Sequence, residues 1–521
     1  MKPIRIVLTI LAALLTGVAF AAGEAPVRIR VDAAKAGPKI DRHIFGQFAE
    51  HLGRGIYEGV WVGPDSPIPN TRGIRNDVVQ ALKTLKVPNV RWPGGCFADE
   101  YHWRNGIGPR EQRPATLNPN WGGVIEPNTF GTHEFYDFLA QIGSESYLSI
   151  NVGSGTAAEA ADWLEYLTTP QPTALAKQRA ANGHPEPFGV TFLGIGNENW
   201  GCGGSMTPDY YVDLLKVFAR YSRNFNTKHP MKKIAVGPDT AHTGYTEAVM
   251  NAWKNKTWAW DIDGISLHYY TVGKGWPPAY KATGFGPDEY ATLLGYTLRM
   301  EELLRTHEAI MDKYDPEKKI ALSVDEWGVW LAPTEGTDPG FLEQQNSQRD
   351  AVIAALNINM FARHADRVRI ANIAQMINVL QAMIFTRKEK MLLTPTYHVF
   401  RMYVPFQDAT SVALELGASE YRRGEVKLPG VDAIAARDAQ GVLHVALTNL
   451  NPEQAAQVQL DLGGVKGTRL RGETLAAPRL DSVNTFEAPG TVVPKPMSVR
   501  VANGKANLTL APASVTVFAV E

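Results

Sequence analysis

Residues 194–204 read Gly194-Ile-Gly-Asn-Glu198-Asn-Trp-Gly-Cys-Gly-Gly204, and the interpretation of the whole chain starts from this stretch. A mostly apolar run from Val190 to Ile195 leads into it and is typical of a buried strand. The run stops at the polar pair Asn197-Glu198, and the glycines that follow indicate a sharp turn. An Asn-Glu pair is most often a helix cap or a turn. A carboxylate at the end of a buried strand, however, is costly to place without a function.

A second stretch of the same design lies further along the chain. The apolar residues Ile320 to Val324 are followed by Asp325-Glu326-Trp327-Gly328. Two strands that each end in a glutamate, each with a tryptophan close behind, predict paired carboxylates at one end of a parallel sheet. Paired carboxylates are the chemical groups that perform glycoside hydrolysis.

Strand and helix patterns alternate eight times between residues 43 and 405. This count predicts an α/β fold, a (β/α)8 TIM barrel, in which the active site lies at the C-terminal ends of the strands. A doubly wound open sheet is the alternative. The expected strands are 44–48, 87–92, 147–152, 190–195, 234–236, 262–267, 320–324 and 368–373. The polar residues at or just after the strand ends include Glu50, Cys96, Asn197, Glu198, Tyr270, Glu326 and Gln375.

From about residue 406 the helical spacing gives way to short alternating stretches separated by turn signals, which predicts a C-terminal antiparallel β-sandwich domain. The alternating run Val27 to Val31 is expected to join that sandwich. The chain therefore divides into four expected parts. They are a signal peptide (1–22), an N-terminal strand segment (23–42), a catalytic barrel (43–405) and a sandwich (406–521).

The first residues carry the pattern of a secretory signal peptide. Lys2 and Arg5 precede an apolar run, and Ala19-Phe-Ala21 offers a cleavage site. We therefore expect an exported protein, periplasmic or extracellular, with no membrane anchor. Cys96 and Cys202 are the only cysteines, and both alternatives remain open for them: a disulfide, or two reduced side chains packed in the site.

Composition excludes several function classes. The formal net charge is −1, so nothing favours a nucleic acid or an anionic membrane as partner. The histidines show no metal-ligand spacing, so neither a metal nor a cofactor is expected. Gly153-Ser-Gly-Thr-Ala-Ala158 matches a dinucleotide fingerprint, but glycine-rich turns between strand and helix are common. Tryptophans near the strand ends suit either core packing or stacking on a sugar ring.

Six motifs, taken together and in this order, carry a family resemblance. They resemble the α-L-arabinofuranosidases of glycoside hydrolase family 51, and the similarity spans nearly the whole mature chain. The motifs are Gly46-Gln-Phe-Ala-Glu-His-Leu-Gly-Arg54, Arg91-Trp-Pro-Gly-Gly-Cys-Phe97, Gly196-Asn-Glu-Asn-Trp-Gly-Cys-Gly-Gly204, Ser266-Leu-His-Tyr-Tyr270, Asp325-Glu-Trp327 and Ala371-Asn-Ile-Ala-Gln375.

The resemblance implies roles for the residues at the strand ends. Glu198 would be the acid/base and Glu326 the nucleophile. The residues expected to bind the furanose are Glu50, Asn197, a strand-six tyrosine and Gln375, with Cys96 at a position where some relatives have Asn. Both Tyr269 and Tyr270 fit the tyrosine motif, and the spacing after His268 favours Tyr270. The resemblance also implies a homo-oligomer, a hexamer.

These observations support one main hypothesis. It is an exported, retaining exo-α-L-arabinofuranosidase that removes terminal non-reducing α-L-arabinofuranosyl groups from plant cell-wall polysaccharides and oligosaccharides. An endo-β-1,4-glycanase on the same barrel is the first alternative, and an open cleft would favour it. A non-catalytic carbohydrate-binding protein is the second, and the presence of both glutamates argues against it.

Overall fold

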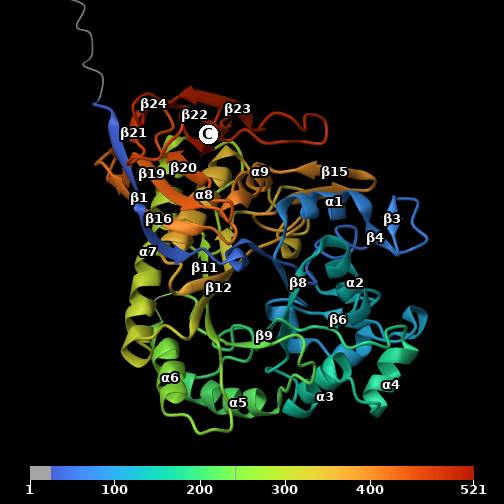
Figure 1. The fold of residues 1–521 in the computed structure, drawn as a ribbon. Helices are drawn as coiled ribbons and strands as arrows, with labels where there is room; N and C mark the ends of the chain where they lie inside the picture. The colour runs from blue at the N-terminus through green and yellow to red at the C-terminus, as the bar shows by residue number, and fades with distance from the viewer. Residues whose placement is uncertain (1–24, 241) are drawn as a thin grey trace, which may run out of the picture.

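The computed structural model describes residues 25–240 and 242–521, and a closed barrel of eight parallel strands forms its centre (Figure 1). The strands follow one another around the barrel in chain order. They are β2 (Gly46–Phe48), β5 (Asn89–Trp92), β8 (Glu145–Ile150), β9 (Phe192–Ile195), β10 (Lys232–Ala235), β11 (Gly264–Thr271), β12 (Ala321–Val329) and β13 (Val368–Ile373). The predicted fold class is confirmed.

Helices surround the barrel and follow the predicted apolar spacing. Helix α1, for example, buries Val78, Ala81, Leu82 and Leu85 on one face. The helices are α1 (Asn76–Leu85), α2 (Thr132–Ile142), α3 (Ala157–Thr168), α4 (Ala174–Ala181), α5 (Pro208–Tyr221), α6 (Thr243–Lys254), α7 (Pro287–Tyr314), α8 (Gln348–Arg363) and α9 (Pro395–Met402). Among the helices that the structure describes, none combines the length and hydropathy needed to cross a bilayer.

Two barrel strands run further than the sequence predicts. The polar residues His268 and Glu326 looked like strand ends, but β11 continues to Thr271 and β12 to Val329. His268 and Glu326 are register partners within the two strands. The strands can continue past these polar residues because their side chains are paired with one another inside the barrel mouth, as described below. At the first strand the opposite occurs: Ile44 and Phe45 belong to a 3-10 turn (Arg42–Phe45) that Asp41 caps.

The C-terminal part forms a nine-stranded sheet around a second apolar core. β1 (Val27–Lys39) lies inside this sheet, antiparallel to β16 and parallel to β21, so the sheet is not wholly antiparallel. Three of its strands, β22 to β24, were not predicted, although the residues of β24 alternate between exposed and buried. The remaining strands are β16 (Thr410–Leu416), β19 (Val431–Arg437), β20 (Leu443–Asn449), β21 (Ala456–Asp461), β22 (Arg469–Leu475), β23 (Lys495–Arg500), β24 (Lys505–Leu510) and β25 (Ser514–Val520).

Short two-stranded hairpins extend several loops. One of them, β6–β7, carries Trp121 to the mouth of the barrel. The hairpins are β3 (Asn70–Thr71) with β4 (Ile74–Arg75), β6 (Thr116–Asn118) with β7 (Val124–Glu126), β14 (Ile384–Arg387) with β15 (Lys390–Leu393), and β17 (Glu420–Arg423) with β18 (Val426–Pro429).

Helix α8 packs between the barrel and the nine-stranded sheet, and in Figure 1 the sheet lies across this helix. All of its residues except Arg363 are buried, including the polar residues Gln348, Arg349, Asp350, Asn357 and Asn359. Polar contacts cross the same boundary: Gln348 Nε2 donates to Ala513 O at 2.7 Å, and Asn359 Nδ2 donates to Asp432 Oδ2 at 2.8 Å. One apolar core cluster contains residues of α8 together with Leu475 of the sheet.

Removing residues 406–521 should therefore leave insoluble protein, because α8 would expose apolar surface and β1 would lose β16 and β21. Expression of 23–405 beside 23–521, with comparison of the soluble fractions, tests this expectation. A soluble and active 23–405 barrel would contradict it.

Candidate active site

A cavity of about 510 Å³ opens at the C-terminal ends of the barrel strands. Every residue that the sequence assigned to the site lines it, which places these side chains together although their roles stay predictions. They are Glu50, Cys96, Asn197, Glu198, Tyr270, Glu326 and Gln375. A cavity of this size and position suits a small ligand.

The turn after β9 holds Glu198 in a left-handed conformation, with φ at 41°. The backbone N–H groups of Gly201 and Gly203 donate to its carbonyl oxygen at 2.6 and 3.1 Å. A Cβ at Gly203 would lie 2.0 Å from the carbonyl oxygen of Asn197, so only glycine fits there. A left-handed non-glycine residue costs about 1–3 kcal/mol and persists where its surroundings over-determine it.

Asp99 is buried and holds this turn in place, and no sequence pattern predicted this role. It belongs to a 3-10 helix, Cys96–Glu100. Its Oδ2 accepts from Asn197 N at 2.9 Å and from Asn199 Nδ2 at 3.4 Å. Its Oδ1 accepts from the backbone N–H groups of Val152 and Gly153 at 2.7 and 2.8 Å. Asp99 therefore ties the ends of β8 and β9 together beside Glu198.

His268 lies between the two candidate catalytic carboxylates. Its Nδ1 is 2.8 Å from Glu198 Oε1 and 3.6 Å from Glu326 Oε2, and its Nε2 is 3.1 Å from Asp325 Oδ1. Burial alone would lower the pKa of His268, but the charges of Glu326 and Asp325 and the hydrogen bond to Glu198 raise it to about 10. His268 is therefore a cation at neutral pH.

Arg91 is a second cation in the site, beside His268. Its guanidinium donates to Glu326 Oε1 at 2.7 Å and to Asn197 Oδ1 at 2.6 Å. The Tyr270 hydroxyl donates to the other oxygen of Glu326 at 2.8 Å. Tyr269 instead donates to a backbone carbonyl, that of Tyr296, away from the carboxylates. Arg91 stood in a recognised motif, but its part in orienting both Asn197 and Glu326 became visible only in the structure.

Glu50 forms the floor of the cavity. Oε1 accepts from the backbone N–H groups of Gly95 and Phe97 at 2.9 and 3.2 Å, and Oε2 accepts from Gln375 Nε2 at 3.1 Å. Burial and the nearby Glu326 charge raise the pKa of Glu50 to about 7. A Cβ at Gly95 would lie 2.9 Å from Glu326 Oε1, so this glycine keeps the floor open.

Glu198 has a different environment from Glu326. Burial raises the pKa of Glu198, the Glu326 charge raises it further, and His268 and Arg91 oppose both. Its side chain is 19% exposed, so solvent reaches it from the mouth of the cavity. A raised pKa favours the protonated form of Glu198, while Glu326 pairs directly with Arg91.

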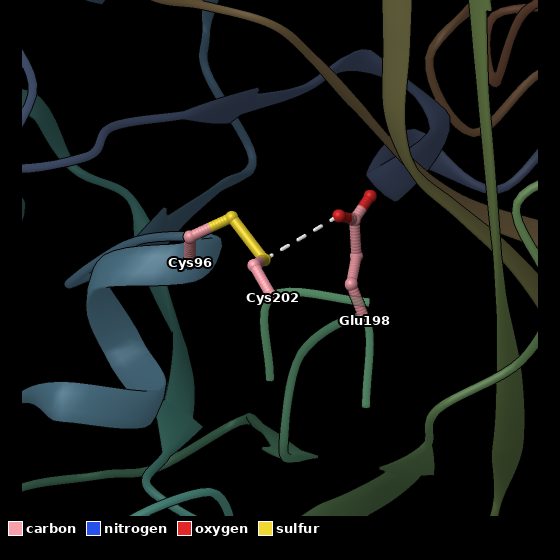
Figure 2. Close-up of side chains that lie close together, drawn as sticks. All are labelled: Cys96, Glu198 and Cys202. Atoms are coloured by element: carbon pink, nitrogen blue, oxygen red, sulfur yellow. Dashed lines mark hydrogen bonds between the residues drawn. A yellow bond between two sulfur atoms is a disulfide. The ribbon is translucent and has the colours of Figure 1, made fainter. Parts of the chain in front are cut away.

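Cys96 and Cys202 form a disulfide beside Glu198, which decides between the alternatives that the sequence left open (Figure 2). The bond joins the loop after β5 to the loop after β9. Cys202 Sγ lies 3.6 Å from Glu198 Oε2. Cys96 therefore meets the cavity as half of a disulfide.

Among the described residues, two groups of side chains have metal-like spacing. Cys96 and Cys202 of the first group, with Glu198, are joined in the disulfide. In the second group Glu198, His268 and Glu326 each offer an atom within 4.8 Å of the others. A protonated His268 presents N–H donors and no lone pair, so this triad is better described as an ion-paired network.

Two family models match the chain, described as the α-L-arabinofuranosidase 1 domain over residues 81–283 and the α-L-arabinofuranosidase C-terminal domain over residues 325–514. A Bacteroides ovatus protein named intracellular exo-alpha-L-arabinofuranosidase is 45% identical, over 95% of each chain. The crystal structure of the family 51 arabinofuranosidase from Xanthomonas axonopodis pv. citri is 47% identical and superposes with a TM-score of 0.93, covering 95% of this chain and 100% of that one. The arabinose complex of the Thermotoga maritima α-L-arabinofuranosidase is 32% identical with a TM-score of 0.84, at the same coverages.

The fold, the buried carboxylates and these similarities define a glycoside hydrolase. The chain belongs to the α-L-arabinofuranosidases of glycoside hydrolase family 51, as its motifs predicted.

The expectation of an exported protein, periplasmic or extracellular, is wrong on this comparison, because the Bacteroides ovatus relative is named intracellular. That expectation depended on a short apolar run behind two basic residues. The predicted signal peptide, residues 1–22, lies outside the described residues.

Arg91→Lys should lower kcat at least about 10-fold, because an ammonium cannot hold Asn197 and Glu326 with one planar fork. The free energy of unfolding should fall by about 1.5–3 kcal/mol, the usual contribution of hydrogen bonds to charged groups. Steady-state kinetics and urea denaturation measure both.

Arg104→Lys is the matched control, because the Arg104–Asp162 ion pair is about half exposed. Its loss of stability should be about 1 kcal/mol or less, with unchanged kcat. Equal effects of the two substitutions would contradict a special role for Arg91.

Proposed function

We propose that this enzyme is an exo-acting, retaining α-L-arabinofuranosidase, with Glu198 as acid/base and Glu326 as nucleophile. The observation that carries this proposal is the short gap between the two carboxylates. One oxygen of each lies within 4.8 Å of the other and of His268 Nδ1 or Nε2. Retaining glycosidases hold their carboxyl groups roughly 5 Å apart, whereas inverting ones need roughly 6.5–9.5 Å to admit a water.

In the first step Glu326 attacks the anomeric carbon and Glu198 gives its proton to the departing oxygen. The raised pKa of Glu198 keeps a proton available for this transfer. Arg91 and Tyr270 hold the two oxygens of Glu326, so that the attacking carboxylate needs little reorientation. The product of this step is a covalent glycosyl–enzyme.

In the second step the ionised Glu198 takes a proton from water, which then attacks the same anomeric carbon. His268 stabilises the Glu198 carboxylate at this stage, because its charged ring lies 2.8 Å from Oε1. Two displacements at one carbon return the original configuration.

The substrate proposal is a terminal, non-reducing α-L-arabinofuranosyl group on a plant cell-wall polysaccharide or oligosaccharide. Glu50, Gln375 and the amide of Asn197 supply hydrogen-bonding groups to the cavity, and we assign the contact with the 2-hydroxyl to Asn197. The relatives named arabinofuranosidases support this choice of sugar. Hydrolysis of 4-nitrophenyl α-L-arabinofuranoside tests it directly.

The family resemblance also supports a homo-oligomer, a hexamer. The outer face of α5 exposes Tyr210, Val217 and Tyr221, the kind of apolar surface that subunit contacts cover. Light scattering of the purified enzyme measures the mass, and a monomer at micromolar concentration would contradict this part.

Glu198→Ala should lower kcat/KM on arabino-oligosaccharides by about 10²–10⁴-fold, and on 2,4-dinitrophenyl α-L-arabinofuranoside by less than about 10-fold. The reason is that a general acid matters in proportion to the basicity of the oxygen that it protonates. Equal losses on both substrates would remove Glu198 from the acid role.

Glu326→Gly should lose activity by about 10⁴-fold or more, because the covalent step disappears. Azide should restore part of the activity on an activated substrate and yield the β-configured glycosyl azide, since it enters from the side that the carboxylate vacated. Glu198→Ala is the matched control, because azide rescue there should yield the α-azide. Proton NMR of the first wild-type product should show the α-anomer; a β-anomer, or exchanged azide products, would refute the mechanism or reverse the two roles.

A further inference from the structure

The proton-carrying oxygen of Glu198 faces a sulfur atom. Glu198 Oε1 accepts from His268 Nδ1, which leaves Oε2 as the oxygen that holds the proton when the side chain is neutral. Cys202 Sγ lies 3.6 Å from Oε2, within reach of a weak hydrogen bond to sulfur (Figure 2). The roles assigned above make no use of this contact.

The direction of that hydrogen bond depends on the state of the sulfur. A disulfide sulfur has no hydrogen, so it can only accept, and the proton between the two atoms must belong to Glu198. A thiol can donate its own hydrogen to Oε2. A hydrogen bond given by the acid favours its neutral form, and one received by the carboxylate favours its charged form.

We propose that Cys202 is a positioning residue for Glu198, and that reduction of its bond to Cys96 weakens Glu198 as a general acid. This inference rests on the proposed role of Glu198. The oxidised pair stabilises the protonated acid that cleaves poor leaving groups; the reduced pair stabilises the carboxylate.

The reduction is an ordinary thiol–disulfide exchange with a dithiol reductant. A reductant thiolate attacks Cys202 Sγ, the Cys96–Cys202 bond breaks, and Cys96 leaves as a thiolate that takes a proton. The second reductant thiol then closes its own disulfide and releases Cys202 as a thiol, so two electrons and two protons pass to the protein. Cys202 is exposed and Cys96 partly exposed, so the attack needs no unfolding.

The other charged groups around Glu198 do not depend on the disulfide. His268 reaches it from β11, Glu326 from β12 and Arg91 from β5, and each is held by partners outside the loops that the disulfide joins. Asp99 holds the Glu198 turn through backbone N–H groups whether or not the bond is present. A change in the pH profile on reduction therefore has one of two causes: the altered hydrogen bond between Cys202 Sγ and Glu198, or the loss of the covalent link between the two loops. Variants can separate these causes.

The first measurement is the pH dependence of kcat/KM for the full-length wild-type enzyme, oxidised and after treatment with dithiothreitol. Free thiols are counted in both samples. With 4-methylphenyl α-L-arabinofuranoside, a poor leaving group, reduction should move the alkaline limb to lower pH by about half to one unit. Above that limb the rate constant should fall about 3- to 10-fold. With 2,4-dinitrophenyl α-L-arabinofuranoside, which needs no acid, the two profiles should coincide.

Two variants separate the sulfur from the covalent link. Both Cys96→Ala and Cys202→Ala lose the disulfide, but only Cys96→Ala leaves a thiol facing Glu198. Cys96→Ala should reproduce the limb of the reduced wild type. Cys202→Ala neither accepts a hydrogen bond from Glu198 nor donates one to it, so its limb should lie between those of the oxidised and reduced wild type. Dithiothreitol should change neither variant. Thermal melting of both variants shows whether the fold is kept.

Each other result overturns the inference. Equal shifts in the two variants would assign the effect to the loss of the covalent link. A wild-type limb that does not move on reduction would show that the disulfide has no effect on Glu198. Two free thiols under oxidising conditions would show that the disulfide does not form. A wild-type enzyme that fails to cleave either arabinofuranoside in both redox states would instead reject the proposed function, and the inference with it.

Discussion

The charge balance at the barrel mouth is the constraint on which the rest of the site depends. Glu50, Glu198, Asp325 and Glu326 meet there, largely out of water, with Arg91 and His268 as their cations. An unpaired buried charge would be prohibitive, so the cations must be in place and some of the carboxyl groups must hold protons. Burial, together with the neighbouring Glu326 charge, raises the pKa values of Glu50 and Glu198. Catalytic function and the stability of the site therefore follow from one balance.

The barrel fold supplies the geometry for this balance. The side chains come from β5, β11 and β12 and from the residues just after β2 and β9. The C-terminal ends of these strands meet at one rim although they are far apart in the chain. Register fixes the central contact, because His268 and Glu326 are direct partners across β11 and β12. The pairing explains why these strands continue through polar residues that, read singly, look like strand ends. A position that would be a turn in isolation becomes part of a strand when a neighbour satisfies its charge.

The sequence predicted the barrel and every candidate residue in the cavity, because strand-end polarity and motif order are local signals. It did not predict Asp99, whose four hydrogen-bond donors lie on the ends of two other strands. The cationic role of His268 was equally hidden, since it depends on carboxylates from β9 and β12. The strands β22 to β24 were also missed, although β24 alternates between exposed and buried residues and could have been predicted from that pattern. Contacts between residues on different strands are what local sequence patterns do not reveal.

Glu198 and Glu326 are the same residue type, so the different roles proposed for them must come from their surroundings. Glu326 accepts hydrogen bonds on both oxygens, from Arg91 and from Tyr270, and this fixed orientation suits the nucleophile role proposed for it. Glu198 accepts a hydrogen bond from His268 on one oxygen, and its other oxygen lies 3.6 Å from Cys202 Sγ. An acid/base must give and recover a proton on the same atom, so it needs one oxygen free of strong donors. In the oxidised protein the neighbour of that oxygen is a disulfide sulfur, which can accept a hydrogen bond from the protonated acid but has no hydrogen to donate.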